Sequence, residues 1–435
     1  MKKKHIYIPI EILVREINSK IIFSYEAALK NYRVYIGTKT GIDKLIQKKK
    51  RTSKAGIFFY KSQIIMNRPY ANDIKSTCEK FIVLDEELGV GISNINATLK
   101  VRAKHLGETD QFFIIGKKIM NKIIKFNKTF KKIFSIAGWL RYDIYKKKNI
   151  NIFNDEINQI KKNFGEYYLF SSNYGALTHR GLKLRMKISK INKNDYFTFQ
   201  KSIDDFKFLK FKLFEFLKKN PKFKLIIRPH PADQMHEDWK IFEKFHNVKV
   251  IYKYDIVPWI ISSKGLIHRG CSTAIDAYFL KKPVYFLKPK RKLHSSEKNL
   301  IYKISKKIKN FDEIIKFKQV KNSKNNNLIN NEIYFGNETT STKILKSIKD
   351  YNITKEDPIK FTIFQNFKNY LIPLIGNIRL KIKFFLLDTK QLKDQKINKF
   401  ISYTELSDKI NLIKNGKHSI KIKEVTREVF QIEKI

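Results

Sequence analysis

The sequence Arg-Pro-His-Pro at 228–231 contains two residues that can bind phosphate, Arg228 and His230. The two prolines fix the backbone and keep the residues before them extended. Because the predicted strand 224–227, with the apolar run 225–227, precedes Arg228, we predict that both side chains stand at the carboxyl end of a strand. A guanidinium and an imidazole at that place suit a phosphorylated ligand. A structural turn, with the histidine bonded to a neighbouring loop, is an equally good interpretation of this motif alone.

A second candidate site follows the predicted strand 265–268 and leads into a predicted helix. Gly270 permits a tight turn between the two elements. Ser272 or Thr273 can cap the helix. The free N–H groups and the dipole at a helix start bind anions, so this turn is predicted to hold a diphosphate.

Two further residues belong to this candidate site, Asp276 and His268. Asp276 lies about one turn into the predicted helix, where a carboxylate can accept hydrogen bonds from ribose hydroxyls. The alternative is an ordinary capped helix with a surface aspartate. That alternative is weakened because His268 and His230 both end strands of the same predicted sheet.

Carboxylates follow two predicted strands in the first part of the chain. We predict Glu11 as a general base and Glu86 as the second candidate, because each follows a strand where a hydroxyl substrate would lose its proton. Glu16 and Lys20 are four residues apart, and for them we expect an exposed ion pair on a helix.

The sequence lacks several motifs that would indicate other chemistry. No Asp-x-Asp pair follows a predicted strand, and there is no nucleophile elbow, P-loop or G-x-G-x-x-G fingerprint. We therefore expect neither a metal nor a cofactor. A leaving phosphate would instead be neutralised by Arg228, His230, His268 and the helix start.

Short apolar runs alternate with helical segments through the first two thirds of the chain, which indicates an α/β fold with parallel sheets covered by helices on both faces. Strands are expected at 6–10, 33–37, 56–60, 81–85, 112–116, 133–137, 167–171, 224–228, 248–252, 265–268 and 283–287. Helices are expected at 18–30, 195–219, 238–245, 257–262 and 272–280.

A polar stretch near 146–158 separates two such alternating regions. We predict two Rossmann-like, doubly wound domains, an N-terminal one at 1–155 and a second at 156–310, which face each other across a cleft. The remainder, 311–435, is predicted to be a basic, partly helical extension. Within it, 361–387 is either a helix packed on the core or, less commonly for such segments, a helix on an anionic membrane surface, and 400–412 is expected to be ordered.

Composition restricts the class of protein. The 435 residues carry 90 Lys+Arg against 40 Asp+Glu, a net charge of +50, but the lysines are spread along the whole chain, so no nucleic-acid partner is expected. Two cysteines cannot build a disulfide framework, which favours a reducing compartment. Glu11 interrupts the first apolar stretch too early for a signal peptide, and no run reaches the about 18 apolar residues of a membrane span. A cytoplasmic protein is therefore expected.

Several motifs in one order resemble GT-B glycosyltransferases, in particular the bacterial surface carbohydrate biosynthesis protein family, whose relatives include CDP-glycerol glycerophosphotransferases and capsule Kdo transferases. The similar segments are RPHP at 228–231, IHRGCSTAIDAYFLKKPV at 267–284, the opening at 8–37, FIVLDEELGVG at 81–91, IAGWLRYD at 136–143 and FSSNYG at 170–175. The chain departs from the family pattern at Leu88, at Trp139-Leu140 and at Asp276.

This resemblance implies a metal-independent enzyme that moves a sugar from a nucleotide-activated donor to a surface polysaccharide such as O-antigen or capsule. The second domain would bind the nucleotide, with Asn173 of the 170–175 turn among its ligands. The first would bind the glycan or lipid-linked glycan acceptor, on the cytoplasmic side of the envelope and at the periphery of the inner membrane. The alternatives are a nucleotide-sugar epimerase of the same fold, a polyol-phosphate transferase and, outside enzymes, an RNA-binding protein.

Overall fold

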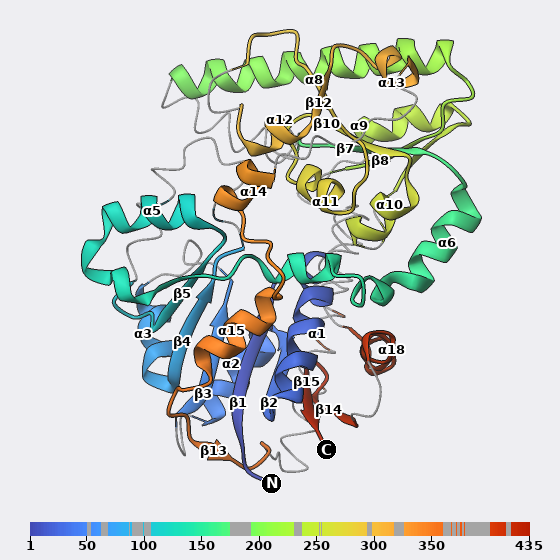
Figure 1. Ribbon diagram of the computed structural model, residues 1–435. Coiled ribbons are helices and arrows are strands. Elements are labelled where there is room, and N and C mark those ends of the chain that lie inside the picture. Colours follow the sequence, from blue (N-terminus) through green and yellow to red (C-terminus); the bar gives the residue numbers. More distant parts are fainter. Residues whose placement is uncertain are drawn as a thin grey trace. The chain divides into compact units, whose positions relative to one another are not determined.

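The computed structural model describes residues 1–49, 54–61, 68–86, 88, 99, 106–174, 193–229, 237–251, 253, 255–293, 298–316, 326–359, 367, 371, 375, 378, 401–414 and 419–435. They form two compact units (Figure 1). Unit 1 comprises Met1–Ile152 and Asn326–Ile435, and unit 2 comprises Phe153–Asn325. Each unit contains one sheet of mainly parallel strands.

Six parallel strands form the main part of the unit 1 sheet, in the order β2-β1-β3-β4-β5-β6. They are β1 (Lys3–Ile10), β2 (Tyr32–Thr38), β3 (Ala55–Tyr60), β4 (Cys78–Leu84), β5 (Gln111–Ile114) and β6 (Phe134–Ile136). All residues of β2 and β3 are buried, as expected for apolar strands with helices on both faces. The structure confirms all six strands predicted in this part of the chain.

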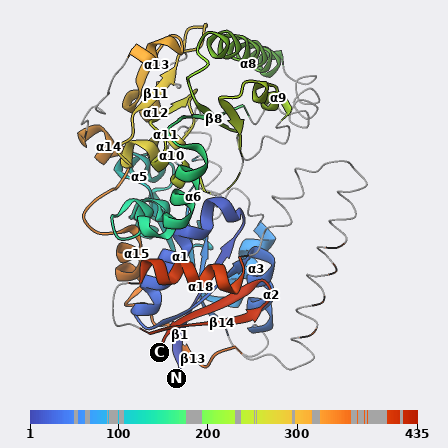
Figure 2. The same cartoon turned by 90° about the vertical axis from the view of Figure 1, so that its right-hand side faces the viewer.

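Helices cover this sheet, and those between β1 and β6 return the chain from one strand to the next. They are α1 (Leu13–Leu29), α2 (Lys39–Lys49), α3 (Arg68–Thr77), α5 (Lys117–Phe126), α14 (Asn326–Glu332), α15 (Thr340–Ile348) and α18 (Tyr403–Ile413), with 3-10 segments η2 (Lys128–Ile133), η3 (Leu140–Tyr145) and η4 (Ile150–Phe153). In α1, Ile17, Ile21 and Ala28 repeat at helical spacing and are buried. Figure 2 shows α18 beside α1, which it contacts.

The end of the chain belongs to unit 1. β13 (Lys355–Glu356) pairs antiparallel with β1, β15 (Val429–Lys434) pairs antiparallel with β2, and β14 (Ile420–Thr426) pairs with β15. The sequence predicts a basic, partly helical extension at 311–435. In the structure Asn326–Ile435 belongs to unit 1, and its late strands extend the first sheet. The order expected at 400–412 is confirmed by α18. The segment 361–387 lies almost wholly outside the described residues, so its membrane role stays a prediction.

Gly37 allows β15 to approach β2 closely. A Cβ atom at this position would lie 2.1 Å from the carbonyl oxygen of Glu428. The backbone N–H of Thr38 donates to the same oxygen at 3.0 Å. No larger side chain fits at Gly37 without moving the start of β15.

Arg33 joins the two ends of the chain to the sheet. Its side chain is 1% exposed and donates to Glu433 of β15 at 2.9 and 3.0 Å. It also donates to the carbonyl oxygens of Met1 and Glu356, each at 2.9 Å. One buried guanidinium thus bonds three chain segments that are distant in sequence.

Asp143 ends the predicted segment 136–143 and holds the chain that returns from unit 2. Its buried carboxylate accepts hydrogen bonds from the backbone N–H groups of Thr340 and Ser341 at 2.6 and 2.7 Å and from the Ser341 hydroxyl at 2.6 Å. These N–H groups lie at the start of α15, where a carboxylate is stabilised by the helix dipole. Asp143 therefore fixes α15 on unit 1.

The unit 2 sheet has six parallel strands in the order β12-β11-β10-β7-β8-β9. They are β7 (Tyr168–Ser171), β8 (Leu225–Arg228), β9 (Val248–Val250), β10 (Gly265–His268), β11 (Val284–Leu287) and β12 (Lys306–Ile308). The helices are α6 (Asn154–Phe164), α8 (Lys193–Lys219), α9 (Glu237–Lys240) with η6 (Ile241–Lys244), α10 (Ile256–Ser262), α11 (Thr273–Phe279), α12 (Leu300–Ile304) and α13 (Asp312–Lys316). One face of α8, with Leu209, Leu213 and Phe216, packs into the unit 2 core.

The two sheets confirm the α/β fold with two Rossmann-like units. All five strands predicted between 167 and 287 are present, and β12 is an addition. Within the described part of the chain, no helix is both long enough and apolar enough to cross a membrane.

We predict that Arg33→Met lowers the free energy of unfolding of unit 1 by about 3 kcal/mol. A loss of about 3 kcal/mol is the lower end of the range for breaking a buried ion pair. We expect the lower value because the Glu433 carboxylate would still be paired with Lys3, at 3.3 Å. Urea unfolding followed by circular dichroism measures the change.

Lys118→Met is the matched control. Its ion pair with Glu332 is 46% exposed on the lysine side, so its loss should cost less than about 1 kcal/mol. Equal midpoints for the two variants would contradict the role given to Arg33.

Candidate functional site

The order of strands in unit 2 reverses between β7 and β10. The chain passes outward from β7 to β8 and β9 and then returns on the other side of β7 as β10. Ligands of open parallel sheets bind at the carboxyl ends of the strands at such a reversal, because the loops that follow the two strands turn to opposite sides. Asn173 follows β7 and Gly270 follows β10, so two predicted nucleotide-binding residues stand here.

Strand register brings the predicted residues together. Ser171, the last residue of β7, pairs with Arg228 of β8 on one side and with His268 of β10 on the other. The Asn173 side chain donates from Nδ2 to the Gly270 carbonyl oxygen at 3.3 Å and bridges the two loops at the reversal. The structure therefore confirms that Arg228 and His268 end strands of one sheet.

His268 supports the loop after β10. It is fully buried, and the backbone N–H of Gly270 donates to its Nδ1 at 3.0 Å. Its Nε2 lies 2.9 Å from the hydroxyl oxygen of Ser305, and that hydroxyl donates to the Ile301 carbonyl oxygen at 2.6 Å. The network thus assigns the ring proton to Nε2. Burial lowers the pKa of His268 to about 3, so the ring is neutral.

This geometry corrects the prediction that His268 contacts a phosphate. Both ring nitrogens are engaged inside unit 2, and no ring atom reaches the surface. The physical reason is that the Gly270 N–H and the Ser305 hydroxyl engage the two ring nitrogens. The left-handed backbone of Gly270, with φ of 98°, permits the tight turn that follows. His268 therefore acts through the shape of the loop.

Two hydroxyl groups lie at the start of α11. Ser272 makes no capping hydrogen bond, contrary to expectation, because its backbone is already helical with φ of −62° and ψ of −20°. Its side chain is exposed. Thr273 Oγ1 is buried and has no hydrogen-bond partner among the described residues. The hydroxyls of Ser272 and Thr273 are therefore candidates for hydrogen bonds to a ligand.

Arg228 and Asp276 lie deeper than predicted. Arg228 is 7% exposed and Asp276 is 6% exposed, so the interpretation of Asp276 as a surface residue is wrong. Arg228 donates from Nη1 to the Lys253 carbonyl oxygen at 2.6 Å and joins the end of β8 to the chain after β9. His230 lies outside the described residues, and its phosphate contact stays a prediction.

An ion pair that the sequence does not predict lies next to the loops of the unit 2 reversal. Arg269 forms an ion pair with Asp205 of α8, and both side chains are largely buried. The Tyr174 hydroxyl donates to the same carboxylate at 2.8 Å. Arg269 and Tyr174 directly neighbour Gly270 and Asn173, so their positions could have been inferred, whereas their partner on α8 could not.

In unit 1 the strand order reverses between β1 and β3. Glu11 follows β1, Lys61 follows β3, and Asp85 and Glu86 follow the neighbouring strand β4. Both predicted base candidates therefore stand at the carboxyl edge of the first sheet.

Two ammonium groups and two carboxylates form a buried network at this edge. Lys61 Nζ lies 2.9 Å from Glu11 Oε2 and 3.1 Å from Glu16 Oε1. Lys20 Nζ lies 2.6 Å from Glu16 Oε2 and also donates to the Pro9 carbonyl oxygen at 2.6 Å. Glu16 and Lys20 are 3% and 4% exposed, so the expected exposed ion pair is in fact buried.

The network keeps its members charged. Burial alone would raise the pKa of Glu16, but the neighbouring Lys20 and Lys61 ammonium groups lower it to about 2. Burial alone would lower the pKa of Lys61, but Glu16 and Glu11 raise it to about 12.

Glu11 is held on both carboxylate oxygens. Oε1 accepts a hydrogen bond from the Tyr60 hydroxyl at 3.1 Å, and Oε2 pairs with Lys61. Both oxygens are thus engaged by side chains of unit 1. The geometry therefore favours a positioning role for Glu11.

Glu86 differs from Glu11 in having an unsatisfied oxygen. Its backbone N–H donates to the Lys61 carbonyl oxygen at 3.2 Å, which fixes it beside the network. Its Oε1 is buried and has no hydrogen-bond partner in the described part of the chain. Burial raises the pKa of Glu86, and this effect outweighs the positive charges of Lys20, Lys61 and Arg141, which act against it; the negative charge of Glu16 adds to the rise. A carboxylate with a raised pKa and an available oxygen has the properties of a general base.

No group of three or more His, Cys, Asp or Glu side chains that could hold a metal ion occurs among the described residues.

No family model matches the chain, and no curated protein matches its sequence. The UDP-GlcNAc 2-epimerase of Methanocaldococcus jannaschii, in complex with UDP-GlcNAc and UDP, matches with a TM-score of 0.49 and 12% identity over 80% of this chain and 99% of that chain. The UDP-GlcNAc 2-epimerase of Neisseria meningitidis, bound to UDP-GlcNAc, has a TM-score of 0.45 and 13% identity over 81% and 100%. A variant of the wall teichoic acid polymerase TagF has a TM-score of 0.42 and 12% identity over 80% and 88%. The two Rossmann-like units follow from the sheets themselves.

We predict that Gly270→Ala weakens nucleotide binding at least tenfold, because an alanine disfavours the left-handed backbone that shapes the loop. Gly165→Ala is the matched control, since Gly165 also has a positive φ, of 62°, but lies after α6. Both variants should lose comparable stability, on the order of 1–3 kcal/mol. Calorimetric titration with UDP, CDP, GDP and CMP measures affinity. Equal affinity for Gly270→Ala and Gly165→Ala would count against this loop as the nucleotide site.

Proposed function

We propose that the chain is a metal-independent glycosyltransferase of the GT-B type, which moves a sugar from a nucleotide-activated donor to a surface polysaccharide such as O-antigen or capsule. The observation that supports this most is the strand-order reversal in each of the two sheets. Hydroxyl and amide groups stand at the unit 2 reversal, and carboxylates stand at the unit 1 reversal. Two sites of different chemistry suit a donor and an acceptor.

Unit 2 would bind the nucleotide. Asn173, Ser272 and Thr273 offer an amide and two hydroxyls, and Gly270 lets the backbone approach a diphosphate closely. His268 and Arg228 would hold the loops after β10 and β9 through hydrogen bonds to their backbones. His230 remains a candidate for the phosphate itself.

Unit 1 would bind the acceptor and supply the base. The acceptor hydroxyl oxygen forms a bond to the anomeric carbon of the donor sugar, the bond from that carbon to the diphosphate breaks, and the proton moves to a carboxylate. Glu86 suits this role, because burial raises its pKa and its Oε1 has no hydrogen-bond partner among the described residues. Glu11 and Lys61 would position it and keep the surrounding charge balanced.

The protein is proposed to act on the cytoplasmic side of the envelope, near a lipid-linked glycan, with 361–387 as the segment that contacts anionic lipid. Aromatic side chains with lysines suit such a surface.

Product analysis separates the proposed transfer from its alternatives. With EDTA present, a panel of nucleotide sugars and a glycan acceptor, we expect a nucleoside diphosphate to appear only when the acceptor is supplied. An epimerised nucleotide sugar without acceptor would indicate the epimerase. A nucleoside monophosphate released from CDP-glycerol would indicate the polyol-phosphate transferase, and rescue by magnesium would reject metal independence.

We predict that Glu86→Gln lowers turnover by about 10²- to 10⁴-fold, the range for removal of a general base, with nucleotide affinity unchanged. The wild-type profile of turnover against pH should also show its acidic limb above the usual pKa of glutamate, because Glu86 must be ionised to accept the proton.

Glu11→Gln is the control from the same edge of the sheet. It keeps an acceptor for the Tyr60 hydroxyl and should lower turnover less than Glu86→Gln. A larger loss for Glu11→Gln, with Glu86→Gln near wild type, would make Glu11 the base.

A further inference from the structure

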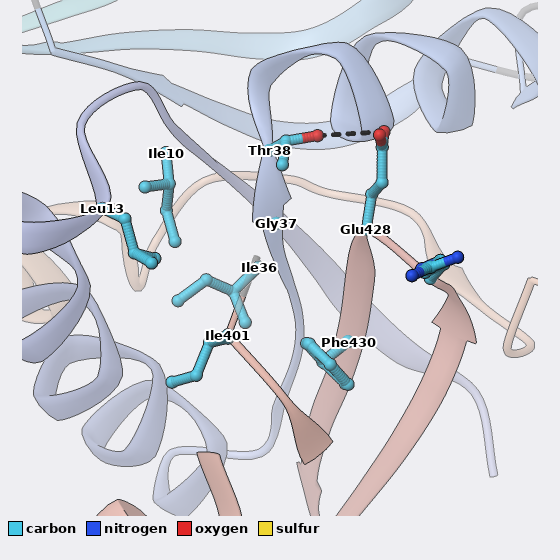
Figure 3. Close-up of a pocket in the computed structure, with 9 residues that line it drawn as sticks. Ile10, Leu13, Ile36, Gly37, Thr38, Ile401, Glu428 and Phe430 are labelled. Atoms are coloured by element: carbon cyan, nitrogen blue, oxygen red, sulfur yellow. Dashed lines mark hydrogen bonds between the residues drawn. The ribbon is translucent and has the colours of Figure 1, made fainter. Parts of the chain in front are cut away.

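A small pocket lies at the carboxyl ends of β1 and β2, beside the loop that carries Glu11 (Figure 3). Its walls are mostly apolar and consist of Ile10, Leu13, Ile36, Ile401 and Phe430. The space accepts one group of about the size of a water molecule. A methyl group has about the same size and needs no polar partner, so it suits the apolar part of the walls.

Three polar residues surround the apolar part of the pocket: Thr38, Arg427 and Glu428. The Thr38 hydroxyl donates to Glu428 Oε2 at 3.1 Å, as the dashed line in Figure 3 shows. The other carboxylate oxygen of Glu428 has no hydrogen-bond partner among the described residues. Arg427, in the turn between β14 and β15, makes no hydrogen bond or ion pair within the described part of the chain. A hydrogen-bond acceptor and a cationic donor thus stand beside an apolar hole.

We propose that this pocket binds the acetamido group of an N-acetylated acceptor sugar. The methyl group enters the apolar space, the carbonyl oxygen accepts a hydrogen bond from Arg427, and the amide N–H donates to Glu428. This assignment rests on the proposed function, in which unit 1 binds the acceptor.

The position of the pocket agrees with that role. It lies on the β2 side of the Glu11 loop, while Lys61 and the carboxylates lie on the β3 side. The proposed base Glu86 follows β4, three strand spacings from β2, which amount to about 14 Å. A glycan held by its acetamido group therefore reaches the base with a hydroxyl of a neighbouring sugar residue.

Other ligands fit less well. A long acyl or isoprenoid chain exceeds a space of one methyl group. A carboxylate or phosphate would meet the negative charge of Glu428 beside Arg427. A neutral group with one donor, one acceptor and a methyl matches all three features.

Saturation-transfer NMR of the full chain with millimolar N-acetylglucosamine or glucose tests the assignment. The acetamido methyl should receive the strongest transfer, and glucose should give little. Leu13→Trp should fill the pocket and abolish the methyl signal, because Leu13 is a half-buried wall residue at the start of α1. Val14→Trp is the control, because Val14 is the next residue along the helix and is also half-buried, but it does not line the pocket.

Arg427→Gln gives a second, surface variant that should weaken N-acetylglucosamine binding severalfold even if Leu13→Trp fails to fold. Equal signals from the two sugars, or a methyl signal that survives both variants, would overturn the assignment. Nucleotide titration of the same samples keeps the two proposals apart. If the wild type binds no nucleotide, the proposed function fails, whatever the methyl signal shows.

Discussion

The strand that starts each sheet lies inside it, and the rest of the structure depends on this constraint. β1 has β2 on one side and β3 on the other, and β7 has β8 and β10. Right-handed crossovers then place helices on both faces and send the following loops apart at the carboxyl ends. Polar side chains gather where the loops separate: Asn173 and Ser272 in unit 2, and Glu11 and Glu86 in unit 1. The same chain geometry therefore creates two sites, and only the residues at the loops decide their chemistry.

Buried charge is tolerated in unit 1 because nearly every charged group has a partner. Lys20 and Lys61 balance Glu16 and Glu11, and Arg33 satisfies Glu433. Removing one partner from such a pair costs far more than the pair itself contributes. Glu86 Oε1 departs from this pattern, with no hydrogen-bond partner among the described residues. An unsatisfied carboxylate beside a balanced network is expected at a functional site, where stability is given up for reactivity.

Local patterns in the sequence predict the parallel strands and the long helix α8 well, because a run of apolar residues or a helical period is visible within a few residues. They also place Glu11, Glu86, Arg228 and His268 at strand ends. They fail where partners come from distant segments. The local sequence predicts that Glu16 and Lys20 are exposed, but Lys61, which follows β3, contacts Glu16 and the pair is buried. The local sequence predicts that His268 is available to a phosphate, but Gly270 and Ser305 form hydrogen bonds with both ring nitrogens. The strand β15 pairs with β2, nearly 400 residues earlier, which no local pattern shows.

The central claim is that the unit 2 reversal binds the nucleotide and the unit 1 reversal does not. Hydrogen exchange of the full chain, read by mass spectrometry with and without saturating UDP, CDP, GDP or CMP, tests it most directly. We predict slower exchange in peptides that span 171–174 and 268–274, with 9–16 and 60–61 unchanged. Slower exchange at 9–16 and 60–61, with 268–274 unchanged, would contradict it.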